Sequence, residues 1–172
     1  MVIDYCHNVD GMRALADFVN RMMEEPVTRA GRLGTTAAGR KGRAIGVIGI
    51  PGDRRDEDQR DYGAVAATAF DEIIVREDRQ LRGRQPGVSA GNVLEGVRSA
   101  RSSAAARTIR AEKILEEISA VKAALRRAQP GDMVVTCVDD AVGVYRTAMA
   151  LAGSARGATA FADPGELEAP EG

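Results

Sequence analysis

Short apolar runs alternate with amphipathic stretches along most of this chain. The runs are rich in β-branched and aliphatic residues and predict buried strands at 1–4, 43–50, 71–75 and 133–138. Between them, apolar residues recur at spacings of three and four, which predicts amphipathic helices. These helices are expected at 11–25, from the acidic stretch 53–58 onward through Tyr62 to Phe70, at 88–97, at 111–128, and around Val144, Met149 and Leu151.

The remaining segments lack periodicity. We expect loops at 27–42, 76–84 and 99–106, and a short strand is possible at 107–110. The helix at 88–97 is predicted to be weak, because Gly91 and Gly96 each cost about 1 kcal/mol relative to alanine. Residues 1–152 are expected to form one domain, and the Ala, Gly, Glu and Pro content of 153–172 predicts a disordered tail.

Strands that alternate with helices over this length predict an α/β fold. The expected architecture is a three-layer, Rossmann-like open sheet, mostly parallel, with helices on both faces and right-handed crossovers. Ligands of such sheets bind outside the carboxyl ends of the strands. Four polar loops follow predicted strands and should meet at that edge: 5–8, 52–58, 76–84 and 139–140.

Composition narrows the range of functions. The net charge is −1 and aromatic residues make up 3% of the chain, which argues against a nucleic-acid partner. No apolar run approaches the roughly 20 residues of a membrane span, and no secretory leader is recognisable, so a cytoplasmic location without membrane contact is expected. The two cysteines, Cys6 and Cys137, are not spaced as a disulfide framework or a zinc site.

Two polar features have alternative interpretations. The charges of 53–58 could be a solvated helix start, because acids are common there. His7 is the only histidine, so no multi-histidine metal site is expected, and it could either hydrogen-bond locally at a strand end or contact a ligand. Sequence motifs for a phosphate loop, a nucleophile elbow or a dinucleotide-binding turn are absent.

Several spaced motifs carry a family resemblance that spans about residues 1–151. The segment DYCHN at 4–8 resembles the D-Y-A-H-N-P signature that opens the carboxyl-terminal domain of Mur ligases, with Cys6 and Val9 as departures. GIPGDRRDED at 49–58, EDRQLRGR at 77–84 and QPGDMVV at 129–135 narrow the resemblance to the last domain of the cyanophycin synthetases.

The resemblance implies one lobe of an ATP-dependent amide ligase. In that family ATP phosphorylates an aspartate side-chain carboxylate, and the α-amine of arginine attacks the acyl phosphate. The phosphate loop and the Mg²⁺ ligands belong to a preceding central domain, so this lobe is not expected to be active without that partner. Asp4 matches the aspartate that contacts the nucleotide, and His7 and Asn8 are expected along the same seam.

The substrate side rests on charge alone. Arginine and an aspartate-rich peptide or polymer are the implied ligands. Asp56, Glu77 and Asp78 are candidates to receive a guanidinium group. A second set would hold polymer carboxylates or phosphate: Arg54, Arg55, Arg82 and Arg84. The alternative function is a stand-alone, non-catalytic binding or regulatory module that retains the fold.

Overall fold

The computed structural model describes residues 1–24, 42–100 and 110–155, and within them strands and helices alternate along the chain. The strands are β1 (Val2–Asp4), β2 (Ala44–Ile48), β3 (Glu72–Val75), β4 (Arg110–Lys113) and β5 (Met133–Cys137). The helices are α1 (Val9–Glu24), α2 (Asp56–Ala66), α3 (Val88–Ala100), α4 (Glu117–Arg127) and α5 (Ala141–Ala155).

The strands form a single parallel sheet in the order β1-β5-β2-β3-β4. The three inner strands, β5, β2 and β3, are buried along their whole length, and their sequences MVVTC, AIGVI and EIIV are correspondingly rich in apolar residues. The predicted α/β open parallel sheet is therefore confirmed. β5 is the last strand in the sequence but lies between β1 and β2 in the sheet, and the order of elements along the chain does not predict this position.

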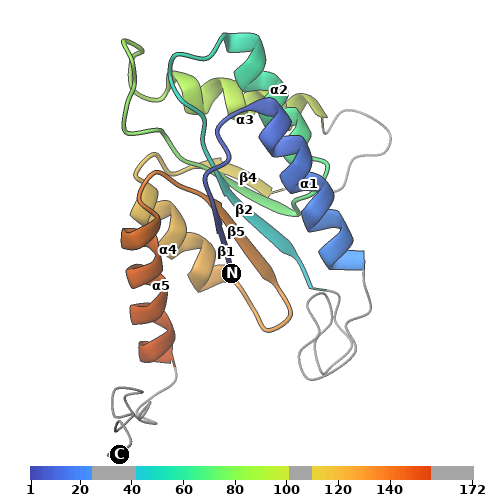
Figure 1. Cartoon of the computed structure of the whole chain (residues 1–172), viewed down its shortest axis with the longest axis vertical. Helices are drawn as coiled ribbons and strands as arrows, with labels where there is room; N and C mark the ends of the chain where they lie inside the picture. The colour runs from blue at the N-terminus through green and yellow to red at the C-terminus, as the bar shows by residue number, and fades with distance from the viewer. Residues whose placement is uncertain (25–41, 101–109, 156–172) are drawn as a thin grey trace, which may run out of the picture.

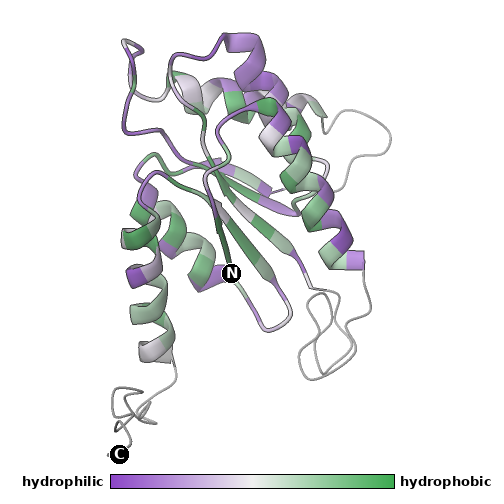
Figure 2. Cartoon of the chain, viewed as in Figure 1, coloured by the Kyte–Doolittle hydropathy of each residue, from purple (hydrophilic) through white to green (hydrophobic). Residues whose placement is uncertain are grey.

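Helices cover both faces of the sheet (Figure 1). Helices α1, α2 and α3 pack on one face, around Val19, Tyr62 and Val97. Helices α4 and α5 pack on the other face, around Val121 and Val144. Figure 2 shows apolar residues concentrated along the strands and polar residues toward the outer surfaces of the helices. In the described part of the chain, none of the helices is long and apolar enough to span a bilayer.

The prediction for 107–128 was wrong in part. Residues 110–113 form edge strand β4, which pairs with β3, and the helix starts only at Glu117. Apolar periodicity at Ile114 and Leu115 suggested an earlier helix start. The Glu116 carboxylate instead accepts from the Ile118 and Ser119 amides at 2.8 and 2.7 Å and so caps the helix N-terminus.

Other boundaries shift by a few residues. Helix α1 begins at Val9 rather than at Gly11, and α3 extends to Ala100. Helix α5 continues to Ala155, past the expected start of the tail at 153. The expected loop 27–42 lies outside the described residues except for its last position, as do residues 101–109 and 156–172.

Candidate functional site

The loops that follow β1, β5, β2 and β3 lie at one edge of the sheet, because these neighbouring strands run parallel. Backbone hydrogen bonds extend the pairing beyond the strands, from Val138 N to Asp4 O at 3.0 Å and from Arg76 N to Ile48 O at 2.8 Å. Helix α5 leaves β5 toward one face, whereas the helices after β1 and β2 leave toward the other. This divergence opens a crevice beside the end of β5.

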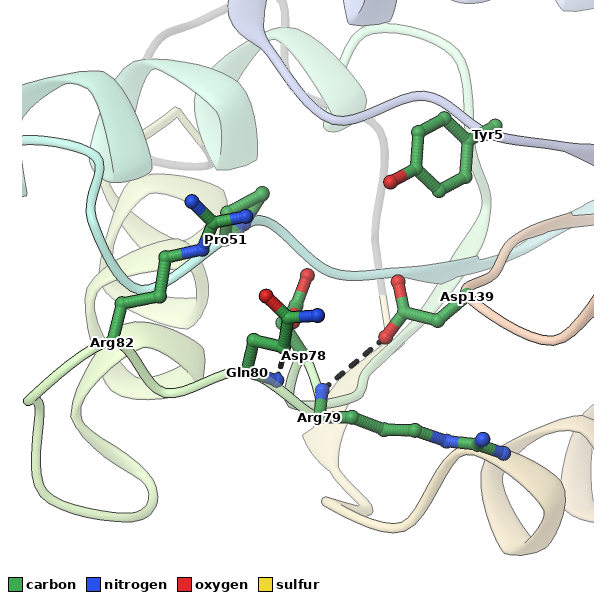
Figure 3. A pocket seen from close by; sticks show the side chains of 7 residues that line it. All are labelled: Tyr5, Pro51, Asp78, Arg79, Gln80, Arg82 and Asp139. Atoms are coloured by element: carbon green, nitrogen blue, oxygen red, sulfur yellow. Dashed lines mark hydrogen bonds between the residues drawn. The ribbon is translucent and has the colours of Figure 1, made fainter.

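A pocket of about 280 Å³, here called the switch-point pocket, occupies this crevice. Its lining comes from all four loops: Tyr5, Pro51, Asp78, Arg79, Gln80, Arg82 and Asp139. Figure 3 shows the Tyr5 hydroxyl and the Asp139 carboxylate pointing into the space between them, while the Arg79 guanidinium points away. The pocket therefore combines an exposed aromatic ring with two carboxylates from different loops.

A second hollow of about 350 Å³, here called the α1–α2 pocket, lies nearby. Its lining joins the start of α1 to the loop before α2: Asn8, Val9, Asp10, Ile50, Arg54 and Asp58. The Nε of Arg54 is buried and has no hydrogen-bond partner, which is costly for a donor on a charged group. A ligand acceptor in this hollow would satisfy it.

Arg76 lies beneath the switch-point pocket, with only 3% of its surface exposed. Its guanidinium donates to both carboxylate oxygens of Asp139, at 2.7 and 3.1 Å, and to the Cys137 carbonyl at 3.0 Å. Burial lowers the pKa of Arg76, but the hydrogen bond and charge of Asp139, together with the Glu117 charge, raise it overall. Gly49 makes room for this side chain, because a Cβ there would lie 2.9 Å from the Arg76 Nε.

Glu117, from the first turn of α4, completes this charge network. Its carboxylate is 3% exposed and accepts from the Asp139 and Asp140 amides at 2.7 and 3.1 Å. It also lies 3.6 Å from the Arg76 Nε and 3.8 Å from the Arg79 Nη2. Arg76 and Glu117 thus fix Asp139 at the pocket wall. Arg76 binds its carboxylate, and Glu117 accepts from its backbone amide.

The predicted nucleotide-binding residues lie along the β1–α1 loop. Asp4 ends β1 with an exposed side chain. The Nδ1 of His7 lies 2.9 Å from the Tyr5 carbonyl, which can only accept, so Nδ1 carries a proton. The Asn8 Oδ1 accepts from the Gly11 amide at 2.7 Å and caps α1, and Asn8 also lines the α1–α2 pocket. His7 therefore makes a local hydrogen bond at the strand end, which is one of the two roles considered for it beside a ligand contact.

Two of the predicted guanidinium receptors already have partners. The Glu77 carboxylate is buried and accepts from the Gly87 and Ala90 amides, so it holds the start of α3. Asp56 pairs with Arg84 at 2.5 Å. Asp78 lines the switch-point pocket, with one oxygen accepting from the Gln80 amide at 2.7 Å. Of the three candidates, only Asp78 lines this pocket.

Of the four predicted anion-binding arginines, two line a pocket and two do not. Arg54 lines the α1–α2 pocket and Arg82 lines the switch-point pocket, where it pairs with Asp53 at 2.9 Å. Arg55 precedes α2 and pairs with Asp58 at 2.8 Å on the surface. Arg84 donates to the carbonyls of Gly52 and Arg54 and so ties two loops together.

Sequence reasoning placed Tyr5 and Asp139 at this edge but did not select them as site residues, and it missed Arg79, Gln80, Arg76 and Glu117. Asp139 comes two residues after the end of the buried strand β5, which is a signal that could have selected it. Arg76 directly follows the buried strand β3, which is a similar signal, whereas nothing local marks Glu117, whose role depends on the order of strands. In the described ranges, no three His, Cys, Asp or Glu side chains gather as a metal site.

Known proteins share this fold and sequence. The family described as "Mur ligase, glutamate ligase domain" matches residues 1–138. The cyanophycin synthetase of Crocosphaera subtropica is 35% identical over 134 residues, which are 78% of this chain and 13% of that protein. The cyanophycin synthetase of Synechocystis sp. is 36% identical over 134 residues, again 78% and 13%.

Solved structures agree at the level of the fold. A UDP-N-acetylmuramoyl-L-alanyl-D-glutamate–2,6-diaminopimelate ligase superposes with a TM-score of 0.60 at 19% identity, over 87% of this chain and 29% of that one. A murein peptide ligase from Psychrobacter arcticus gives a TM-score of 0.55 at 12% identity, over 88% and 27%. The chain thus spans less than a third of the length of each of these proteins.

Proposed function

This chain belongs to the family of the Mur ligase glutamate ligase domain, and on that premise we propose that it is the carboxyl-terminal lobe of an ATP-dependent amide ligase. The observation that carries the proposal is the gathering of four loops around two adjacent polar pockets at one sheet edge. Such an edge offers half of a binding site. The other half, with the phosphate loop and the Mg²⁺ ligands, would come from a central ATPase domain.

The proposed reaction adds arginine to an aspartate side chain. Transfer of the γ-phosphoryl group of ATP to the aspartate carboxylate gives an acyl phosphate and ADP. The α-amine of arginine then attacks the acyl carbon, an amide forms, and phosphate leaves. Support for this substrate pair comes from the relatives named cyanophycin synthetase, which are 35% and 36% identical to this chain.

On the nucleotide side, Asp4, His7 and Asn8 would face the ATP held by the partner domain. The Asp4 carboxylate is exposed at the end of β1, where it can accept hydrogen bonds from ribose hydroxyls. Arg54 lies in the neighbouring α1–α2 pocket with an unpartnered Nε. An anionic oxygen from a phosphate or a carboxylate would supply that acceptor.

On the substrate side, the switch-point pocket suits the guanidinium of arginine. Asp78 and Asp139 provide carboxylates, and the Tyr5 ring, with Tyr5 67% exposed, provides a face for a planar cation. Arg82 at the rim of the pocket would attract the carboxylates of an acidic polymer. Asp56 and Glu77 are assigned to loop structure instead, because they hold Arg84 and the start of α3 and neither lines this pocket.

Calorimetric titration with ATP, arginine and an aspartate–arginine peptide tests these assignments. We expect Asp78→Asn to weaken arginine binding about tenfold, because one charge-assisted hydrogen bond is worth about 1.5–3 kcal/mol. Asp17→Asn, on the exposed surface of α1, should leave binding unchanged. Arg54→Ala should weaken binding of ATP or of the peptide, whereas its neighbour Arg55→Ala is the matched control.

Ligation itself requires the partner domain. Joined to a central ATPase domain of a cyanophycin synthetase, the chain should support arginine-dependent phosphate release, and Asp4→Ala should raise the KM for ATP. If Asp4→Ala, Arg54→Ala and Asp78→Asn all bind ligands as the unchanged chain does, the site proposal is wrong. Ligand binding without any ligation in the joined protein would instead favour a stand-alone binding module.

A further inference from the structure

Two cysteine side chains lie together under the β1–α1 loop. Asp4 pairs in register with Cys137 across the β1–β5 ladder, and Cys6 follows two residues later. Cys6 lies in the loop after β1, and both Cys6 and Cys137 pack in the buried cluster that α1, α2 and α3 cover. Cys6 is 7% exposed and Cys137 is fully buried.

Helices α1 and α2 enclose the two cysteines, which belong to the same buried cluster. A Cβ on Gly11 of α1 would lie 3.4 Å from the Cys6 Sγ, so α1 closes the site from one side. From α2, the buried Tyr62 hydroxyl donates to the Cys6 carbonyl at 3.2 Å. Each thiol is close enough to shift the pKa of the other, and both are free thiols in this structure.

We propose that Cys6 and Cys137 form a reversible intramolecular disulfide when the protein meets a peroxide. The Cys6 thiolate attacks a peroxide oxygen and becomes a sulfenic acid, and the other oxygen leaves as water. The Cys137 sulfur then attacks the Cys6 sulfur, and its proton leaves with the sulfenic hydroxyl as a second water. Two thiols are oxidised by two electrons in total, and one hydrogen peroxide is reduced to two waters.

The surroundings of the two cysteines indicate which sulfur reacts with the peroxide first. The neighbouring Cys137 thiol lowers the pKa of Cys6, and burial opposes this effect. The neighbouring Cys6 thiol and complete burial raise the pKa of Cys137. Cys6 is also the less buried of the two, so it is the attacking thiol and Cys137 is the resolving thiol.

Such a bond would hold the β1–α1 loop, which carries the DYCHN motif at 4–8, in a fixed position. Cys6 lies between Asp4 and His7, and Cys137 lies two residues before Asp139 on the neighbouring strand. A covalent link therefore joins the β1–α1 loop to the end of β5, beside the switch-point pocket. The disulfide does not depend on the proposed ligase function, because the link would form in the isolated chain.

The full 172-residue chain should be treated with hydrogen peroxide in its native state, alkylated with N-ethylmaleimide and weighed intact. We expect a monomer that is lighter by two hydrogens and carries no alkyl group, reversed by dithiothreitol. Oxidation should raise the unfolding temperature by about 5–10 °C, because the bond closes a long loop. Hydrogen exchange at residues 5–9 should slow in the oxidised form.

Cys137→Ser and Cys6→Ser are the matched controls, since each removes one sulfur with little change in volume. Oxidised Cys137→Ser should carry a Cys6 sulfenic acid, trapped by dimedone, and Cys6→Ser should resist oxidation. Two alkylated cysteines after peroxide treatment, or a disulfide-linked dimer, would show that the internal bond does not form. Unchanged exchange at residues 5–9 would show that it does not clamp the loop.

Discussion

The guanidinium of Arg76 connects loops that are far apart in the sequence. It binds the carboxylate of Asp139 and the carbonyl of Cys137 at the end of β5, and the carbonyl of Glu77 in its own loop. A buried arginine is stable only when its charge is paired and its donors are satisfied. Arg76 therefore positions the wall of the switch-point pocket rather than contacting a ligand itself.

Glu116 offers a test at the scale of one residue. A hydrogen bond with the Ser119 side chain lowers its pKa most, burial opposes this effect, and the Ile118 and Ser119 amides lower the pKa further. A lowered folded-state pKa means that the stabilisation is complete above the unfolded-state pKa of about 4.3 and is lost as the pH falls through the folded-state value. We expect Glu116→Ala to reduce the free energy of unfolding by about 1 kcal/mol at pH 7.

Urea unfolding at pH 7 and at pH 3 measures this effect. The difference between the unchanged chain and Glu116→Ala should shrink at the lower pH, because the carboxylate then becomes protonated. Asp17→Ala, on the exposed side of α1, should change stability by less than about 0.5 kcal/mol at either pH. A loss of the same size at both pH values would contradict a cap by an ionised carboxylate.

At the scale of elements, helices α2 and α3 pack at unusually close range through glycine. A Cβ on Gly96 would lie 1.9 Å from the Arg60 carbonyl oxygen, whereas one on Gly91 would meet nothing within 4 Å. Sequence propensity counts both glycines as costs to α3. Packing separates them, because Gly96 permits backbone contact with α2 and Gly91 does not.

This contrast gives a prediction with its own control. Gly96→Ala should destabilise the fold by about 3 kcal/mol, since the overlap is with backbone that cannot move aside. Gly91→Ala should stabilise it by about 0.5–1 kcal/mol through helix propensity. Thermal and urea unfolding of the two variants measure both effects, and equal changes would refute the proposed role of Gly96 in the α2–α3 contact.

At the scale of the whole molecule, the chain has the fold of one lobe, and it spans 13% of the relatives named above. A lobe that supplies half of the ligand contacts should bind each ligand weakly alone. We expect dissociation constants for ATP and arginine above about 10 μM, which corresponds to less than about 7 kcal/mol of binding free energy. Calorimetry on the isolated chain measures this, and a submicromolar constant for ATP would contradict the lobe proposal.

The sequence by itself determined the class of fold, most elements and the edge where ligands should bind. These features follow from local patterns: apolar periodicity, Gly and Pro at turns, and polar loops after buried strands. The same patterns misassigned 111–116, where pairing with β3 and the Glu116 cap outweighed a helical spacing.

Only the tertiary structure decided which charged side chains line a pocket and which pair within the chain. In the sequence, Glu77 and Asp78 are adjacent acids, but one is buried as a helix cap and the other lines a pocket. Likewise, the insertion of β5 between β1 and β2 brought Cys137 to Cys6 and Asp139 to Arg76. The physical reason is that an ionisable group is defined by its partners and its burial, and both depend on strand order rather than on neighbours in the chain.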